Sequence, residues 1–232
     1  MVSIFALQMD DKISESHLNF LMKIVPREKA ERIRQYISKN SANQTLLGEV
    51  LIRFLICKRL NITNEQIYFD LNEYGKKRLR GSNDLHFNIS HSGKWIVCSI
   101  GKHYNGIDIE KIQPIDIELA KKNFTYSEYF YLKKIRLELR SAEFIRIWTL
   151  KESYIKCLGK GLSIPLDSFE FKLANRKIKL KGEQGKNFVI EQMCLNNEYY
   201  VAVCSYKEKI ISKLNFIDIK ELLQYFGSPI LF

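Results

Sequence analysis

The pattern of apolar and polar positions predicts one strand and three helices in the first 60 residues. Residues 2–9 alternate in polarity and contain β-branched side chains, which is typical of a strand. The helices are expected after Ser14 or Ser16, from Pro26 to about Ser38, and from Ser41 to Leu60. In the third, apolar residues recur at i, i+3 and i+4 and form one apolar face: Leu46, Leu47, Val50, Leu51, Phe54 and Leu55.

The remaining chain alternates between groups of strands and groups of helices. Turn residues separate strands predicted at 67–69, 85–90, 95–100 and 106–110. Helices are predicted next at 117–123, 127–139 and 141–158. Further strands are predicted at 169–173, 177–180, 189–195 and 199–205, and an amphipathic segment at 217–226.

This repeated order predicts an α+β protein made of two similar halves that meet around residues 101–105. We expect an amino-terminal half at residues 1–103, a carboxy-terminal half at residues 104–210 and an extension at residues 211–232.

The composition is that of a folded protein, with 46% hydrophobic and 27% charged residues. No apolar run approaches the roughly 20 residues that span a bilayer, and residues 1–12 make a poor signal peptide. The five cysteines are scattered and form no C-x-x-C pair, which argues against a disulfide framework or a zinc site. We therefore expect a cytoplasmic protein with reduced, buried or half-buried thiols.

Basic residues outnumber acidic ones by 37 to 26, for a formal net charge of +11. Such a charge attracts nucleic acid, an anionic membrane, a phosphate-rich cofactor or an acidic protein, and an ordinary solvated lysine-rich surface has the same balance. The chain carries no zinc-finger, RNP-type or helix-turn-helix signature, so a nucleic-acid-binding module is not expected.

The segment Gly106-Ile107-Asp108-Ile109-Glu110 contains two acidic residues at strand spacing. Residues i and i+2 of a strand share a face, so Asp108 and Glu110 lie side by side while the isoleucines point into a core. Paired carboxylates suit a hard cation such as Mg²⁺. An exposed edge strand with solvated acids gives the same pattern.

A second segment, Trp148-Thr-Leu-Lys-Glu-Ser-Tyr-Ile-Lys156, is predicted to be helical. Glu152 and Lys156 stand four residues apart on one face, where such a pair is favourable. Either this is an ordinary exposed pair, or Glu152 is a third metal ligand and the lysines neutralise a phosphate.

Two other regions suit an anion. Residues 87–93, Phe-Asn-Ile-Ser-His-Ser-Gly, leave a strand for a small-residue turn where hydroxyls, backbone N–H groups and an imidazole can converge. No G-x-S-x-G motif accompanies this segment, so a serine hydrolase is not expected. Basic residues also recur at helical spacing: Arg27, Lys29, Arg32 and Arg34.

Together these motifs resemble the Sfp-type 4′-phosphopantetheinyl transferases, which move phosphopantetheine from coenzyme A to a serine of a carrier protein. The resemblance covers nearly the whole chain, and G-I-D-I-E followed by W-x-x-K-E-x-x-x-K carries it most specifically. It extends over Tyr36–Arg53, Glu73–Lys76, His86–Gly93, Gly106–Lys111, Phe124–Glu128, Trp148–Lys156 and Gly159–Phe169. It implies two pseudo-twofold-related halves with the active site in the cleft between them.

The resemblance also implies roles for individual residues. It assigns Mg²⁺ to Asp108, Glu110 and Glu152, with Glu152, Lys156 and Glu128 in catalysis and Glu128 holding a metal-bound water. It assigns the coenzyme A site to Lys29, Arg32, Thr45, Lys76, Ser90, His91, Asp108 and Lys156. Trp148 and Lys151 are motif positions with mainly structural roles.

Three residues depart from the family pattern around the 3′-phosphate pocket. Gln44 replaces a basic residue, Lys77 replaces a frequent proline, and Arg32 replaces a lysine, which alters the donor geometry. The partners implied are coenzyme A and acidic acyl or peptidyl carrier proteins of pathways such as nonribosomal peptide antibiotics, with the enzyme a monomer. A catalytically silent or divergent Mg²⁺-dependent member of the same fold is the alternative.

Overall fold

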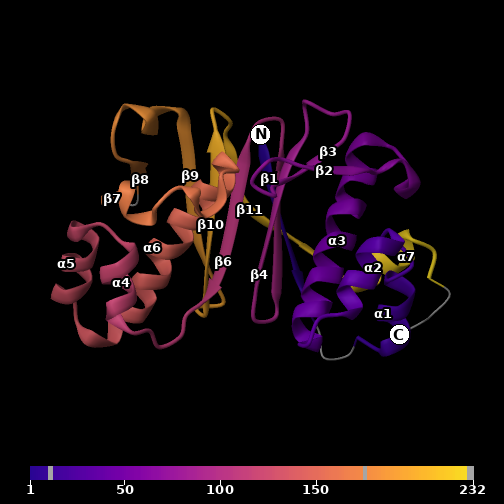
Figure 1. The fold of residues 1–232 in the computed structure, drawn as a ribbon, viewed down its shortest axis with the longest axis horizontal. Helices are drawn as coiled ribbons and strands as arrows, with labels where there is room; N and C mark the ends of the chain where they lie inside the picture. Colours follow the sequence, from indigo (N-terminus) through magenta and orange to yellow (C-terminus); the bar gives the residue numbers. More distant parts are fainter. Residues whose placement is uncertain (10–12, 175–176, 229–232) are drawn as a thin grey trace.

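The computed structural model describes residues 1–9, 13–174 and 177–228. Strands occupy the middle of the molecule, and helices cover them on two opposite sides (Figure 1). Helices α1, α2, α3 and α7 lie on one side, and α4, α5 and α6 lie on the other.

The first half contains the predicted strand and three helices. These are β1 (Val2–Gln8), α1 (Glu15–Leu21), α2 (Arg27–Arg34) and α3 (Lys39–Leu60). Ser14 caps α1, and Ser38, which was placed in the preceding helix, caps α3 instead. Four strands follow: β2 (Phe69–Leu71), β3 (Lys77–Leu79), β4 (His86–Ser92) and β5 (Trp95–Gly101).

The second half has the same succession of elements. It starts with β6 (Asn105–Lys111), α4 (Ile117–Asn123), α5 (Tyr126–Lys134) and α6 (Leu137–Leu158). The predicted boundary between the last two helices was wrong, because α5 ends at Lys134 and residues 137–139 already belong to α6. The strands β7 (Phe171–Ala174), β8 (Lys177–Leu180), β9 (Phe188–Leu195) and β10 (Tyr199–Tyr206) complete it.

The two halves share one strand order. In the first, β1 pairs with β5 and β5 with β4; in the second, β6 pairs with β10 and β10 with β9, all antiparallel. Each half also has one helix of 22 residues, α3 or α6, before its strand hairpin. The predicted α+β fold of two similar halves is therefore confirmed.

The carboxy-terminal segment returns to the first half. Strand β11 (Ile210–Ile217), which the sequence pattern did not predict, pairs in parallel with β1. Helix α7 (Ile219–Tyr225) then buries Ile219, Leu222 and Leu223 in the core beside α3. Residues 229–232 of the predicted extension lie outside the described residues.

A continuous apolar layer joins the two sheets. Ile4 and Ala6 of β1 and Val97 of β5 form one buried cluster with Ile107 and Ile109 of β6. The side chains on either side of each isoleucine of β6 therefore point away from this layer. The chemistry of the candidate site lies on that opposite face.

Candidate active site at the junction of the two halves

Asp108 and Glu110 project from β6 on the face away from the apolar layer, as the alternation predicts. Asp108 is 2% exposed, and burial raises its pKa despite the neighbouring Lys156. Glu110 is half-buried, and burial together with the charge of Asp108 raises its pKa to about 7.

Strand β4 of the first half runs beside β6 and contacts it through side chains. The N–H groups of Ile107, Ile109 and Lys111 donate to Asn88 Oδ1, Ser90 Oγ and Ser92 Oγ at 3.1, 3.4 and 3.1 Å. The polar residues of the Phe87–Gly93 motif thus face the acidic strand. The Ser90 hydroxyl also donates to Asp108 Oδ1 at 2.9 Å.

Gly106 lets helix α6 approach β6 very closely. A Cβ atom at residue 106 would lie 2.2 Å from the Ser153 carbonyl oxygen and 2.3 Å from the Cys157 nitrogen. Only glycine fits this contact, which brings the polar face of α6 against the two carboxylates.

Lys156 and Glu152 reach the acidic strand from α6. Lys156 Nζ lies 2.6 Å from Asp108 Oδ1 and 3.0 Å from Ser90 Oγ, so its partner is Asp108 and not the Glu152 that helical spacing suggested. Glu152 is half-buried, and burial followed by the charge of Asp108 raises its pKa. The three predicted metal ligands are therefore close to one another, because the charge of Asp108 acts on both Glu110 and Glu152.

The donor atoms fit a hard divalent cation. Asp108 Oδ2 is buried and has no hydrogen-bond partner among the described residues, so a ligand position is open beside the oxygen that Lys156 holds. All three side chains offer only oxygen, as Mg²⁺ prefers. Within residues 1–9, 13–174 and 177–228, however, no three acidic, histidine or cysteine side chains converge closely enough to form a complete metal cage.

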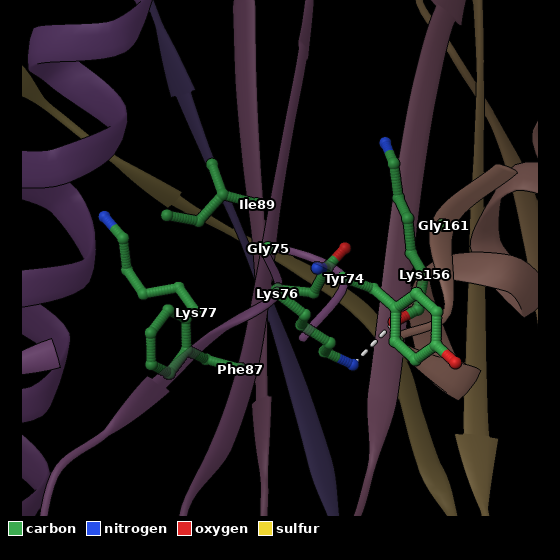
Figure 2. A pocket seen from close by; sticks show the side chains of 10 residues that line it. Tyr74, Gly75, Lys76, Lys77, Phe87, Ile89, Lys156 and Gly161 are labelled. Carbon is green, nitrogen blue, oxygen red and sulfur yellow. Dashed lines mark hydrogen bonds between the residues drawn. The ribbon is translucent and has the colours of Figure 1, made fainter. Parts of the chain in front are cut away.

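Lys76 joins the halves and does not point into open space. Its Nζ donates to the carbonyl oxygens of Asn105 at 2.9 Å and Cys157 at 3.2 Å, and to that of Lys156 (Figure 2). These carbonyls include two at the end of α6, which the helix itself cannot satisfy. Burial lowers the pKa of Lys76 to about 8. Its predicted contact with coenzyme A stays a prediction.

A pocket of about 350 Å³ lies over this joint. One wall is the Tyr74–Lys77 turn of the first half, and the other is formed by Lys156, Gly159 and Gly161 of the second (Figure 2). Lys76 and Lys77 point in opposite directions from the turn, Lys76 toward the carbonyl of Lys156 and Lys77 away from it.

A neighbouring pocket of about 280 Å³ is strongly basic. It is lined by Lys29 and Arg32 of α2, Glu49 and Arg53 of α3, and Lys77, which also lines the first pocket. Glu49 forms ion pairs with Arg53 at 2.9 Å and with Lys77. Burial and the charge of Lys77 lower the pKa of Lys29. Lys77 was expected only to depart from the family pattern, where a proline is frequent. In the structure it follows Gly75-Lys76 and lines this basic pocket.

Thr45 and His91 are less closely involved. Thr45 is half-buried on α3 and is not among the described residues lining these two pockets. His91 is largely exposed but within electrostatic reach of Lys156 and Asp108. Gln44, the other departure, is buried and donates from Nε2 to the Gly93 carbonyl at 2.8 Å, which ties α3 to the β4–β5 turn.

Glu128 is held by contacts within the second half. It forms a capping box with Thr125 at the start of α5, and its Oε2 lies 2.8 Å from Lys151 Nζ. Lys151 is 0% exposed and also donates to the carbonyls of Leu166 and Phe169. The structural interpretation of Lys151 fits these contacts, and the same contacts give Glu128 a structural role.

Two remaining expectations concern the whole chain. The five cysteines are free, with Cys194 exposed and not buried as expected. No helix of the described residues is long and apolar enough to cross a membrane.

Comparison with known proteins identifies the family. The model of the 4′-phosphopantetheinyl transferase superfamily matches residues 105–204, and that of the 4′-phosphopantetheinyl transferase amino-terminal region matches residues 12–102. The 4′-phosphopantetheinyl transferase gsp of Aneurinibacillus migulanus is 43% identical over 73% of this chain and 70% of its own. The 4′-phosphopantetheinyl transferase Sfp of Bacillus subtilis is 35% identical over 96% of this chain and all of its own.

Among solved structures, the holo-[acyl-carrier-protein] synthase of Thermotoga maritima is 21% identical with a TM-score of 0.38, over 45% of this chain and 63% of its own. That similarity is too low to support a conclusion. The full-length sequence relatives are sufficient: the chain belongs to the 4′-phosphopantetheinyl transferase family.

Proposed function

We propose that this enzyme transfers 4′-phosphopantetheine from coenzyme A to a serine of an apo acyl or peptidyl carrier protein, releasing adenosine 3′,5′-bisphosphate. The observation that carries the proposal is the meeting of Asp108, Lys156, Glu110 and Glu152 at the junction of the halves, beside the pocket that Lys156 also lines. A buried carboxylate with one free oxygen, two further acids and one ammonium group suit a diphosphate with a divalent cation.

Asp108, Glu110 and Glu152 would hold Mg²⁺. When bound, the metal supplies positive charge to the diphosphate of coenzyme A. Lys156 neutralises Asp108 in this structure. With a cation held at Asp108, the Lys156 ammonium would be available to the phosphates and would offset charge on the leaving bisphosphate. Ser90 and His91 would complete this part of the cofactor site.

The basic pocket would bind the nucleotide end of coenzyme A. Lys29 and Arg32 have no carboxylate partner within ion-pair distance among the described residues, so they are available to an anion. The diphosphate lies at Lys156 in this proposal, which leaves the ribose phosphate for Lys29, Arg32 and Lys77. Thr45 and Lys76 would border this site.

Glu152 is our candidate for the general base that takes the proton of the carrier serine. Burial and Asp108 raise its pKa above that of an ordinary glutamate, which strengthens it as a base. Glu128 would assist through a bound water. We expect Glu152→Gln to lower turnover at least a hundredfold. Near-normal turnover with Mg²⁺ bound would exclude the role.

The proposed setting is a cytoplasmic monomer that activates acidic carrier proteins, including those of nonribosomal peptide antibiotic pathways. Intact-mass spectrometry of an apo carrier protein incubated with the enzyme, coenzyme A and Mg²⁺ tests the reaction. We expect the carrier to gain one phosphopantetheine, and EDTA to prevent it. No gain on several acyl and peptidyl carriers would contradict the proposal and favour the silent alternative.

A further inference from the structure

Strand β4 of the first half is joined to strand β6 of the second by hydrogen bonds to the side chains of β4, and not to its main chain. Asn88, Ser90 and Ser92 each accept one N–H bond from β6, and each lies nineteen residues before its donor. The constant offset means that β4 and β6 run in parallel and in fixed register. The first half therefore determines the position of the strand that carries Asp108 and Glu110.

Ser90 and Ser92 also donate hydrogen bonds. A hydroxyl has one proton and two acceptor lone pairs, so it can take an N–H bond and donate at the same time. Ser90 donates to Asp108 Oδ1 and Ser92 donates to Glu110 Oε2, both at 2.9 Å. Because Lys111 N–H already occupies a lone pair of Ser92, the direction of the remaining proton is restricted.

Glu110 has no comparable support elsewhere. Ser92 is the one hydrogen-bond donor to its side chain among the described residues, whereas Asp108 is also held by Lys156. A glutamate side chain has several freely rotating bonds, and a ligand that is already oriented binds metal at a lower entropic cost.

We infer that Ser92 is a positioning residue that orients the Glu110 carboxylate for Mg²⁺. This rests on the proposed metal role of Glu110. Ser92 belongs to the first half and Glu110 to the second, so the geometry of the metal site depends on the junction of the halves. Asn88 supplies the matched comparison, because it makes the same kind of contact to β6 but touches no carboxylate.

The test is Mg²⁺ binding, measured by calorimetry on the full-length enzyme saturated with coenzyme A and without a carrier, so that no turnover occurs. Loss of an outer hydrogen bond to a metal ligand typically lowers metal affinity about 10–100-fold. We expect Ser92→Ala to weaken Mg²⁺ binding about tenfold, and Ser92→Thr, which keeps the hydroxyl, to stay within about twofold of the wild type. Asn88→Ala should retain wild-type Mg²⁺ affinity.

Kinetics gives a second readout. Ser92→Ala should need a higher Mg²⁺ concentration to reach half of its maximal turnover rate. At saturating Mg²⁺ its turnover should largely match that of the wild type. Wild-type Mg²⁺ affinity in Ser92→Ala, or an equal loss in Asn88→Ala, would overturn the inference and leave the proposed metal site intact. A wild-type enzyme that binds no Mg²⁺ with coenzyme A would overturn both.

Discussion

At the scale of single residues, the two oxygens of Asp108 are in different situations. Oδ1 accepts hydrogen bonds from Lys156 and Ser90, while Oδ2 is buried without a hydrogen-bond partner in the described part of the chain. An unpartnered buried acceptor destabilises the fold, and binding sites commonly contain such atoms because a ligand completes them. Burial and the charge of Asp108 raise the pKa of Glu110 and Glu152, and a bound cation would favour their ionised forms.

The raised pKa of Glu110 predicts a pH-dependent stability. Its pKa is about 7 in the fold against 4.5 ordinarily, so between these values the native state holds more protons than the unfolded one. The free energy of unfolding should therefore fall as pH rises from 4.5 to 7, and the contribution should be absent in Glu110→Gln. We expect a wild-type decrease of about 1–2 kcal/mol relative to the variant, discounted for partial exposure.

Urea unfolding across this pH range, without metal, makes the measurement. Saturating Mg²⁺ and coenzyme A should remove the decrease, because a bound cation favours the ionised carboxylate. Parallel curves for the wild type and Glu110→Gln would show that the carboxylate ionises normally in the fold.

Lys77 should contribute to recognition of the ribose phosphate. It lines both pockets, the basic one together with Lys29, and is paired with Glu49, which keeps Arg53 as a second partner. A charged hydrogen bond contributes about 1.5–3 kcal/mol, so Lys77→Ala should lower kcat/KM for coenzyme A about 10–100-fold. With 3′-dephospho-coenzyme A, the variant and the wild type should agree within about twofold. An equal loss with both substrates would exclude selectivity for this phosphate.

Residue positions that depend on local spacing could be predicted from the sequence. The i, i+2 rule placed Asp108 and Glu110 on one face, and Ile107 and Ile109 on the opposite face in a core. Local spacing could not predict the partners of Lys76, which are carbonyl groups at the end of α6, 80 and 81 residues away along the chain. The alternation of Asn88, Ser90 and Ser92 was visible, but its purpose required knowledge of the neighbouring strand.

At the scale of elements, a buried ion pair fixes α5 to α6. Lys151 of α6 is fully buried and pairs with Glu128, the residue that closes the capping box of α5. Removing one partner of a buried pair leaves an uncompensated charge, which commonly costs 3–5 kcal/mol. We expect Lys151→Met to lower the free energy of unfolding by about that amount in urea denaturation.

The double variant Lys151→Met, Glu128→Gln is the control, because it removes both charges and keeps a side chain able to cap α5. It should recover much of the lost stability. A double variant as unstable as Lys151→Met would mean that the lysine acts through its contacts with Leu166 and Phe169. Glu128→Gln alone also tests the proposed water: unchanged turnover would exclude that catalytic role.

Element prediction failed where partners are distant in sequence. Strand β11 contacts β1 about 210 residues away, and its edge position leaves a mixed pattern without clear alternation. Helix α5 was extended too far because residues 135–139 remain compatible with a helix, although Ile135 and Arg136 are extended in the structure. The helix at Ile117–Asn123, by contrast, has Asp116 as an N-cap and was placed correctly.

At the scale of the whole molecule, the apolar layer between the sheets fixes one half against the other. Val2, Trp95 and Tyr199 are buried in this layer together with side chains of β6 and β10. The pocket is therefore formed between elements of fixed relative position, and Lys76, which lines it, adds a polar connection between the halves.

The net charge of +11 predicts electrostatic steering of an acidic carrier. Lys121 and Lys122 of α4 and Lys133 and Lys134 of α5 are all exposed on the second half. Replacing these four by Ala should raise the KM for the carrier about tenfold at low ionic strength, since local charge governs association more than chemistry. The kcat and the KM for coenzyme A should stay near wild-type values, and salt should reduce the difference.

A second quadruple variant separates the patch from the overall charge. Lys23, Lys102, Lys209 and Lys213 are also exposed, and their replacement by Ala removes the same amount of charge from elsewhere on the surface. If only net charge steers the carrier, the two variants will show equal increases in KM. If the helices α4 and α5 guide the carrier, the first variant alone will show a large increase, and its kinetics will lose most of the salt dependence of the wild type. Salt-insensitive wild-type kinetics would contradict steering altogether.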